Sequence, residues 1–292
     1  MVYFEKPIIR QSLLELGISP ELPANIITEQ GIKKIISISL CANALTEADI
    51  HFGTLTNLES FYIPSGDLSD SLAEEIGKNL KRVSELHLRN MMLTPGTWRG
   101  LGKLSNVSEL LLAYCSIPDE SFEDGTEISP TTLSIGAVPI SETGLKKLIK
   151  PDNLENIFLA QTSISDDIAS FFDECPKLDY INIEAANIQC LFVTQMRNTD
   201  SLRYLSLYDT NIDDDILAGV SRFPNLKSLS INGSKVSEAS IPLLETLSKR
   251  LDKIVLLQSG KYLFYHNNDK FLYDMWQREQ QKIENNEIDK SP

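Results

Sequence analysis

The sequence has few of the residues that build catalytic and metal-binding sites. Its 292 residues include three histidines, His51, His87 and His266, which lie far apart along the chain. The four cysteines form no C-x-x-C pair and have no histidine at the spacing of a metal site. There is no G-x-S-x-G motif, no phosphate-binding loop and no dinucleotide-binding glycine pattern. These absences predict that the protein is not an enzyme and uses no cofactor or metal.

Positive charge is also scarce. Lysine and arginine together number 27 against 41 acidic residues, so the formal net charge is −14. Nucleic-acid binding needs clusters of basic residues against the phosphates, and no such cluster is visible. Much of the acid lies at expected helix starts, where carboxylates complement the helix dipole. The remaining excess favours a basic protein partner over a nucleic acid.

Long apolar segments are missing. The first residues, Met1 to Pro7, lack the basic and then apolar pattern of a signal peptide. No apolar run approaches the roughly 20 residues that a membrane helix needs. We therefore expect a protein that does not enter membranes, lies in the cytoplasm and keeps its cysteines as reduced thiols.

One phrase, by contrast, is repeated about ten times at a spacing of 23 to 25 residues. It reads L-x-x-L-x-L-x-x-(small)-x-(L/I), and residues 178–188, LDYINIEAANI, are a nearly undamaged copy. A fixed period of this length predicts a solenoid whose repeats bury their apolar faces against their neighbours. The first position of each copy is Ile35, Leu58, Val83, Val107, Pro130, Leu154, Leu178, Leu202, Leu226 and Leu251.

Each repeat predicts a strand followed by a helix. Positions one, four and six are apolar and positions three, five and seven vary, which is typical of a strand with one buried face. A small or hydrogen-bonding residue at position nine indicates a tight turn whose side chain bonds to the backbone of adjacent coils. The second half begins with Ser, Thr, Asp or Pro, usually followed by acid, and then has apolar residues at helical spacing.

This pattern resembles the leucine-rich-repeat family over residues 32–260. The period near 24 and the residues at position nine are most similar to the bacterial and cysteine-containing subclasses. The resemblance implies an α/β fold: a right-handed arc or horseshoe with a parallel sheet on its concave side and helices on its convex side. Pro130 and Val138 depart from the pattern, so the fifth copy is the weakest.

The predicted organisation is an N-terminal cap (1–34), a repeat solenoid (35–260) and a C-terminal cap with a charged tail (261–292). Residues 261–266 and 270–274 read as two aromatic strands around a polar turn. Their rings either cover Leu251, Ile254 and Leu256 as an end cap or form a docking surface. Residues 118–130 are too polar for a packed helix, and the sequence leaves open whether they form a drifted loop, a hinge or a lateral binding site.

The predicted binding surface is the concave face, where outward strand positions are rich in aromatic and charged residues. Exposed tyrosine and arginine on a rigid scaffold are typical anchors of protein interfaces. Phe158 is singled out because an outward apolar ring is costly without a partner or a neighbour. The alternative is that neighbouring rings only pack on one another. The candidate residues are Tyr62, His87, Arg89, Glu109, Tyr114, Phe158, Tyr180, Glu184, Tyr204, Tyr208 and Asp209.

These features predict a non-catalytic, protein-binding scaffold, either an inhibitor or immunity protein or a secreted bacterial effector. The Glu-rich segment 279–287 resembles acidic C-terminal signals of some effectors, which makes export into a host cell without a signal peptide the alternative location. A structural or self-assembling solenoid is the second hypothesis, so both a monomer and a homo-oligomer remain open. An enzyme is less favoured, and so is a ubiquitin-ligase receptor, because 34 residues are too few for a recruiting domain.

Overall fold

A computed structural model describes residues 2–3, 26–27, 36–39, 55–117, 127–185, 188–232, 235–258 and 261–268. The chain divides into two compact units, Met1–Leu178 and Asp179–Pro292, and each is described by itself. The boundary falls inside the predicted solenoid. The predicted strand 270–274, the tail 279–287, most of the segment 118–130, and Cys41 and His51 lie outside the described residues.

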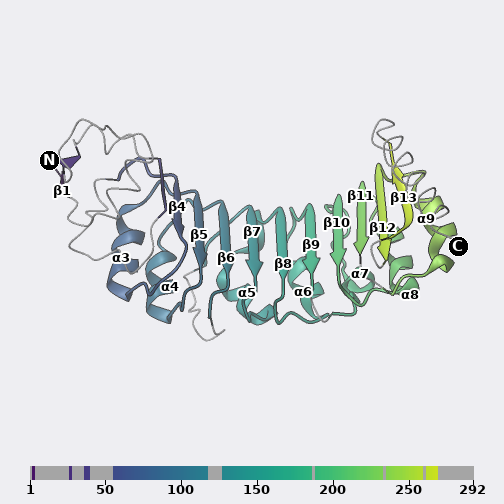
Figure 1. Cartoon of the computed structure of the whole chain (residues 1–292), viewed down its shortest axis with the longest axis horizontal. Helices are drawn as coiled ribbons and strands as arrows, with labels where there is room; N and C mark the ends of the chain where they lie inside the picture. Colours follow the sequence, from purple (N-terminus) through teal and green to yellow (C-terminus); the bar gives the residue numbers. More distant parts are fainter. Residues whose placement is uncertain are drawn as a thin grey trace, which may run out of the picture. The chain divides into compact units, whose positions relative to one another are not determined.

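The first unit contains six parallel strands, which pair in chain order. They are β3 (Ser37–Ser39), β4 (Ser60–Ile63), β5 (Glu85–Arg89), β6 (Glu109–Ala113), β7 (Thr132–Gly136) and β8 (Asn156–Ala160). Its helices are α3 (Asp70–Asn79), α4 (Pro95–Leu101), α5 (Glu142–Leu148), α6 (Ile168–Asp173) and the 3-10 turn η4 (Pro151–Asn153) (Figure 1). A two-residue antiparallel pair, β1 (Val2–Tyr3) with β2 (Ile26–Ile27), belongs to the same unit.

The second unit continues the strand–helix alternation. Its parallel strands are β9 (Tyr180–Glu184), β10 (Tyr204–Tyr208), β11 (Ser228–Asn232) and β12 (Lys253–Gln258). Its helical segments are α7 (Phe192–Gln195), α8 (Asp214–Ala218), η5 (Gly219–Arg222), η6 (Glu238–Ser240) and α9 (Ile241–Leu247). The last described strand, β13 (Lys261–Asn267), pairs antiparallel with β12 and confirms the first of the two aromatic strands. Phe264 lies opposite the buried Leu256, on the same side of the sheet.

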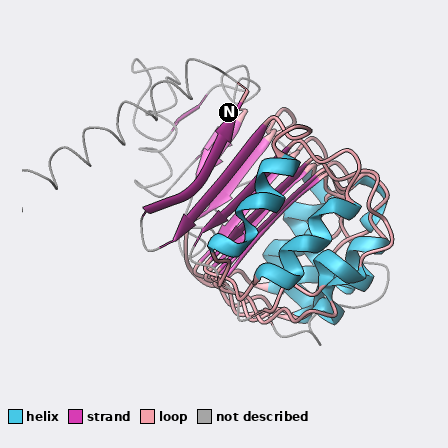
Figure 2. Ribbon diagram, turned by 90° about the vertical axis from the view of Figure 1, so that its right-hand side faces the viewer, coloured by secondary structure: helices cyan, strands magenta, loops and turns pink. Residues whose placement is uncertain are grey.

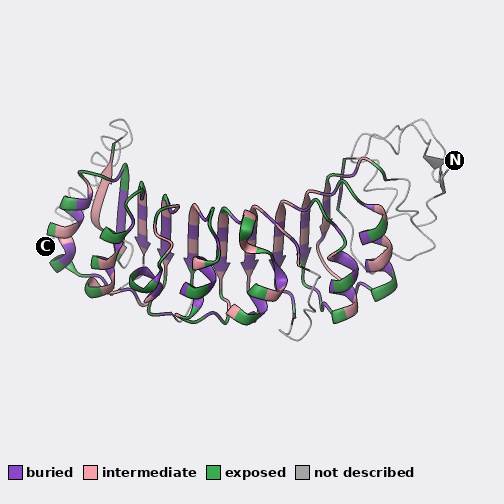
Figure 3. Ribbon diagram, turned by 180° about the vertical axis from the view of Figure 1, so that it is seen from behind, coloured by how far each residue is buried: buried purple, intermediate pink, exposed green. Residues whose placement is uncertain are grey.

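The alternation of the strands follows the sequence pattern. Residues at positions four and six, such as Leu86 and Leu88 of β5, are fully buried against the helices. Residues at positions three, five and seven point the other way, and we call this side the open face. The helices cover the opposite side of the strands (Figure 2), and buried and partly exposed residues alternate along most of the strands (Figure 3). Equivalent positions of successive repeats are paired in register, as in Leu86 with Leu110.

The fifth copy, expected to be the weakest, forms the regular strand β7. Pro130 occupies position one and is buried. In five other copies the position-one N–H donates to a turn carbonyl three residues earlier, as Leu58 does to Leu55 and Leu154 to Pro151. The sheet bonds begin at position two, where the N–H of Thr131 donates to Ser108. Proline at position one therefore removes no sheet hydrogen bond.

Most of the predicted helix caps that lie in the described residues are present, and helix starts also connect neighbouring repeats. The side chains of Ser69, Ser141 and Asp213 accept hydrogen bonds from N–H groups of the first turns of α3, α5 and α8, whereas α6 begins after Asp167 and not at the predicted Ser165. In addition, Asp70 at the start of α3 accepts hydrogen bonds from the Thr94 hydroxyl (2.5 Å) and the Thr97 hydroxyl (3.0 Å) of the next repeat. The Asp70 carboxylate thus does more than complement a helix dipole, because it also connects one coil to the next.

Helices α3 and α4 pack backbone to backbone through glycines. A Cβ atom added to Gly100 would lie 2.5 Å from the backbone carbon of Ala73 and 2.5 Å from the backbone nitrogen of Glu74. An added Cβ on Gly77 would overlap the carbonyl oxygen of Gly100. Glycine at these two positions is therefore required by close approach of the helices.

The corner after each of the strands β5 to β10 has a conformation that the sequence did not indicate. Position eight is left-handed, with φ between 48° and 54°, at Asn90, Tyr114, Ala137, Gln161, Ala185 and Asp209. Only Asn and Asp among these tolerate this region well. The prediction for position nine is confirmed at Cys115, whose thiol donates to the Leu88 carbonyl of the preceding coil (3.5 Å). It is wrong at Thr162 and Thr210, whose buried hydroxyls find no hydrogen-bond partner among the described residues.

Candidate functional site

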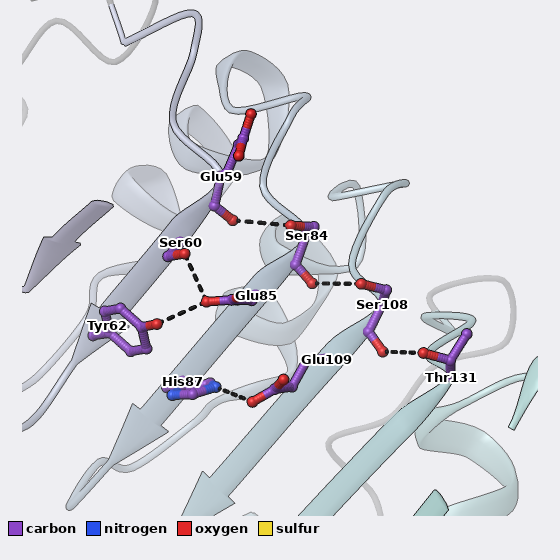
Figure 4. Close-up of polar contacts among 9 residues, drawn as sticks. All are labelled: Glu59, Ser60, Tyr62, Ser84, Glu85, His87, Ser108, Glu109 and Thr131. Atoms are coloured by element: carbon purple, nitrogen blue, oxygen red, sulfur yellow. Dashed lines mark hydrogen bonds and ion pairs between the residues drawn. The ribbon is translucent and has the colours of Figure 1, made fainter. Parts of the chain in front are cut away.

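On the open face of the first unit, five side chains from three adjacent strands form two hydrogen-bonded sets joined by a ring contact, and we call the whole group the Tyr62–His87 cluster. The group joins Ser60 and Tyr62 of β4, Glu85 and His87 of β5, and Glu109 of β6 (Figure 4). Parallel, in-register pairing places Tyr62 directly beside His87 and Glu85 directly beside Glu109. The cluster is therefore a direct product of the repeat register.

Glu85 anchors the tyrosine end of this cluster. Its carboxylate accepts hydrogen bonds from the Ser60 hydroxyl (2.6 Å) and the Tyr62 hydroxyl (2.7 Å). These two bonds lower the pKa of Glu85, so the carboxylate stays charged, while donation to Glu85 raises the pKa of Tyr62 and keeps the phenol neutral. The Tyr62 ring is thereby fixed in one orientation.

Glu109 plays the same part for the histidine. The Nε2 atom of His87 lies 2.8 Å from Oε1 of Glu109. The rings of Tyr62 and His87 meet edge to face, with centroids 4.5 Å apart and an interplanar angle of 70°. Edge-to-face contact is a favoured arrangement for two aromatic rings. Two half-buried rings thus stand rigidly on the sheet, each held by its own carboxylate.

Beside these rings lies a hollow of about 250 Å³. Its lining comprises Ser39, Tyr62, Ile63, Pro64, His87, Arg89 and Leu111. Pockets for small molecules usually measure about 300–1,000 Å³, so this hollow has the size of a subsite for one side chain of a larger ligand. Arg89, at the end of β5, is exposed, and its guanidinium makes no hydrogen bond or ion pair within the described part of the chain.

A ladder of hydroxyl groups holds the beginnings of these strands. The Ser108 hydroxyl donates to the Ser84 carbonyl (3.2 Å) and the Thr131 hydroxyl to the Ser108 carbonyl (3.1 Å), as Figure 4 shows. The same carbonyls also accept backbone N–H groups of the next strand. The strands that carry the Tyr62–His87 cluster are therefore firmly registered.

Two further candidates of the first unit lie apart from this cluster. Phe158 on β8 is only partly exposed and is in contact with other residues. The expected cost of an isolated outward ring is therefore reduced. Tyr114 has 60% of its surface exposed and occupies the left-handed corner just after β6. It lies at the edge of the open face and not on a strand.

The second unit carries a separate group of rings, Tyr180, Tyr204 and Tyr208, which we call the tyrosine cluster. The rings of Tyr180 and Tyr204 pack with centroids 6.0 Å apart, and the Tyr208 hydroxyl lies 3.0 Å from the Ser230 hydroxyl. Ser206, on the open face between them, is only 6% exposed. Burial is the main cause that raises the pKa of Tyr180. These contacts favour the alternative interpretation in which the rings pack on one another.

Acidic and basic groups flank the tyrosine cluster. Glu184 ends β9 and is exposed, and Asp209 occupies the left-handed corner after β10. Arg203 lies with its guanidinium carbon 5.7 Å from the centre of the Tyr204 ring and is ion-paired with Asp179, its Nη2 lying 2.8 Å from Oδ2. The guanidinium of Arg203 is therefore engaged inside the unit.

Reactive chemistry has little support in the described residues. No group of three or more His, Cys, Asp or Glu side chains in the described ranges is arranged to hold a metal ion. Burial raises the pKa of the Cys115 thiol and raises the pKa of Cys175 to about 12, so both stay protonated at neutral pH. No helix in the described ranges has the length and apolar character to cross a membrane.

Comparison with known proteins gives a fold and no further relationship. No protein-family model and no curated protein matches the sequence. Among solved structures, an internalin (inlF) from Listeria monocytogenes superposes with a TM-score of 0.56 at 16% identity, covering 87% of this chain and 69% of that one. The chain has the leucine-rich-repeat fold.

Two more solved structures are similar at lower scores. An internalin C2 from Listeria monocytogenes matches at 16% identity and a TM-score of 0.46, covering 88% of this chain and 95% of that one. A leucine-rich-repeat protein from Leptospira interrogans matches at 15% identity and a TM-score of 0.28, covering 80% of each chain. The in-register repeat of strand and helix in the structure agrees with the fold that the leucine-rich-repeat resemblance implied.

The sequence singled out Tyr62, His87, Arg89 and Glu109, and the structure brings these four together. The sequence also indicates Glu85 as an outward residue of the same group, but it missed Ser60, which shares the Glu85 carboxylate with Tyr62. The sequence contained a signal for Ser60, because it occupies position three, as Glu85 does, and each lies two residues before an aromatic ring of its own strand.

Proposed function

We propose that this leucine-rich-repeat protein is a non-catalytic scaffold that binds a protein partner through its open face. The observation that carries the proposal is the Tyr62–His87 cluster, in which two rings are fixed beside a hollow that has the size of one side chain. Binding hot spots are typically rigid aromatic residues next to a pocket on a scaffold. Because the rings are already ordered, little conformational entropy is lost when a partner docks.

The charge of the chain supports a partner that is basic overall. A net charge of −14 attracts a basic protein over a long range and raises its association rate at low salt. An inhibitor or immunity protein against a basic toxin fits this description, and so does a secreted effector that binds a host protein. The acidic tail 279–287 lies outside the described residues. Because the effector hypothesis depends on this tail, its deletion followed by an export assay separates the two roles.

The test is affinity capture with matched variants, followed by titration calorimetry with the purified partner. Tyr62→Ser combined with His87→Ser removes the cluster, and Tyr180→Ser combined with Tyr204→Ser removes the tyrosine cluster. Lys147→Ser on α5 serves as the control on the helix side. Each variant is first checked for an unchanged circular dichroism spectrum.

We expect the first pair to weaken binding at least about 30-fold, because hot-spot truncations cost 2 kcal/mol or more. The control is expected to bind as the wild type does. Loss of binding with the tyrosine-cluster pair alone would move the site to the second unit. Equal binding by all variants would refute the open face as the binding surface.

A further inference from the structure

The charged groups on the open face of the first unit are separated by sign. Its two acids, Glu85 and Glu109, occupy position three, near the start of their strands. Arg89 occupies position seven, at the end of β5, and is the only lysine or arginine on the described strands β3–β8. Four residues of extended chain separate the Cα atoms of Glu85 and Arg89 by about 13 Å. The arginine therefore has no acid of its own strand within reach.

The acids are also already engaged. Glu85 accepts from Ser60 and Tyr62, and Glu109 is bonded to His87. Neither carboxylate lines the hollow, whereas Arg89 does. An exposed guanidinium with no partner in the described residues thus stands at a hollow from which the nearby negative charges are withdrawn.

The rest of the hollow is suited to the aliphatic part of a side chain. Leu111 and Pro64 supply apolar surface, and the Tyr62 and His87 rings supply a second wall. A guanidinium pairs with a carboxylate through two parallel hydrogen bonds, and it repels a lysine or arginine. The complementary group is therefore a short aliphatic stem that ends in a carboxylate.

We propose that this hollow is the subsite for a glutamate side chain of the protein partner, with the methylene groups against Tyr62 and Leu111 and the carboxylate paired with Arg89. The inference rests on the proposed function and names the local chemistry of that same face. A partner that is basic overall meets the acids at position three and places one acidic residue over position seven. Arg89 then selects the orientation of the partner along the strands.

The test uses three blocked pentapeptides that differ only at the central residue, which is glutamate, glutamine or lysine between leucines. Each peptide is titrated into the full chain while the Arg89 side-chain Nε–H signal and the Tyr62 and His87 ring signals are followed by NMR. We expect the glutamate peptide to shift these signals saturably and to bind at least about fivefold more tightly than the glutamine peptide, because a charge-assisted pair is stronger than a neutral one.

The variants Arg89→Gln and Arg89→Lys separate charge from geometry. Arg89→Gln is expected to remove the fivefold preference for glutamate, and Arg89→Lys to retain only part of it, because an ammonium group lacks the planar fork. Lys253→Gln is the matched control, since Lys253 is an exposed cation of the open face in the second unit and does not line the hollow.

The opposite outcomes are equally clear. Tighter binding of the lysine peptide, equal binding of all three peptides, or no binding of any peptide would overturn the glutamate assignment. If a captured partner depends on Tyr62 and His87 but binds Arg89→Gln as tightly as the wild type, the proposed function stands and this inference fails. If the glutamate peptide binds as expected but no partner depends on the open face, the proposed function fails and the subsite chemistry stands.

Discussion

Replacing Gly100 with alanine tests how closely helices α3 and α4 pack. Taken as a helix residue alone, alanine is better than glycine by about 1 kcal/mol. The structure predicts the opposite sign, because the new Cβ would lie 2.5 Å from two backbone atoms of α3 and 2.8 Å from the Ala73 carbonyl oxygen. Backbone atoms cannot rotate away as a side chain can, so the two helices must separate. Overpacking of this kind typically costs about 1–3 kcal/mol, and helix separation places Gly100→Ala at the upper end, with a net loss of about 2 kcal/mol.

The assay is urea unfolding followed by circular dichroism, with amide hydrogen exchange to locate the change. Exchange is expected to accelerate in Asp70–Asn79 and Pro95–Leu101 and to stay unchanged in the second unit, because repeats transmit strain mainly to their neighbours. The matched control is Gly136→Ala on β7, where an added Cβ meets nothing within 4 Å. This control should be neutral or gain about 0.5–1 kcal/mol. A Gly100→Ala protein as stable as the Gly136→Ala protein would refute the close approach of the helices.

Three further predictions concern stability. Ala137→Gly should raise the free energy of unfolding by about 0.5–1 kcal/mol, because it relieves a left-handed alanine (φ 52°), whereas Ala160→Gly on β8 should lower it by a similar amount; urea midpoints that move together would contradict this. Thr210→Val should stabilise by about 1 kcal/mol, because it removes a buried hydroxyl that has no partner among the described residues; calorimetry that shows a loss would imply a bound water. The lowered pKa of Glu85 means that its hydrogen bonds stabilise the fold above the unfolded-state pKa near 4.3 and that this contribution is lost as the pH falls through the lower folded-state pKa. Glu85→Gln should therefore melt below the wild type at pH 7, and the difference should shrink below about pH 4; a constant difference from pH 7 to pH 3 would exclude this cause.

The repeat and its strand–helix order were predictable because the residue type at each position of the repeat indicates whether that position is buried. Leucine or isoleucine at positions four and six is enough to place a strand, since each such residue is buried against the same side. Even the fifth copy follows this pattern, and Pro130 fits because position one makes no sheet bond. Helix starts were predictable from Ser69, Ser141 and Asp213 for an equally local reason.

What could not be predicted depends on which side chains meet across repeats. Position three reads as serine in β4 and glutamate in β5, and only the register shows that Ser60 and Tyr62 both donate to Glu85. The Arg89 guanidinium likewise has no partner in the described residues because Glu85 lies too far away along the strand and because both acids are already bonded to other side chains. The Thr210 hydroxyl has no hydrogen-bond partner among the described residues, and corners such as Tyr114 are left-handed. Both features depend on backbone geometry that the sequence does not reveal.

The carboxylates that bridge successive helix starts give the protein a response to acid that differs from ordinary melting. Hydrogen bonds to Thr94 and Thr97 lower the pKa of Asp70, and bonds to Ser237 and Ser240 lower the pKa of Asp214. These bonds join neighbouring coils and contribute nothing to the strand ladder or to the apolar core. Protonation of Asp70 and Asp214 therefore weakens the contacts between neighbouring coils. The repeats are therefore expected to be less stiff in acid. Single-molecule stretching at neutral and low pH would show this as a lower stiffness at unchanged contour length.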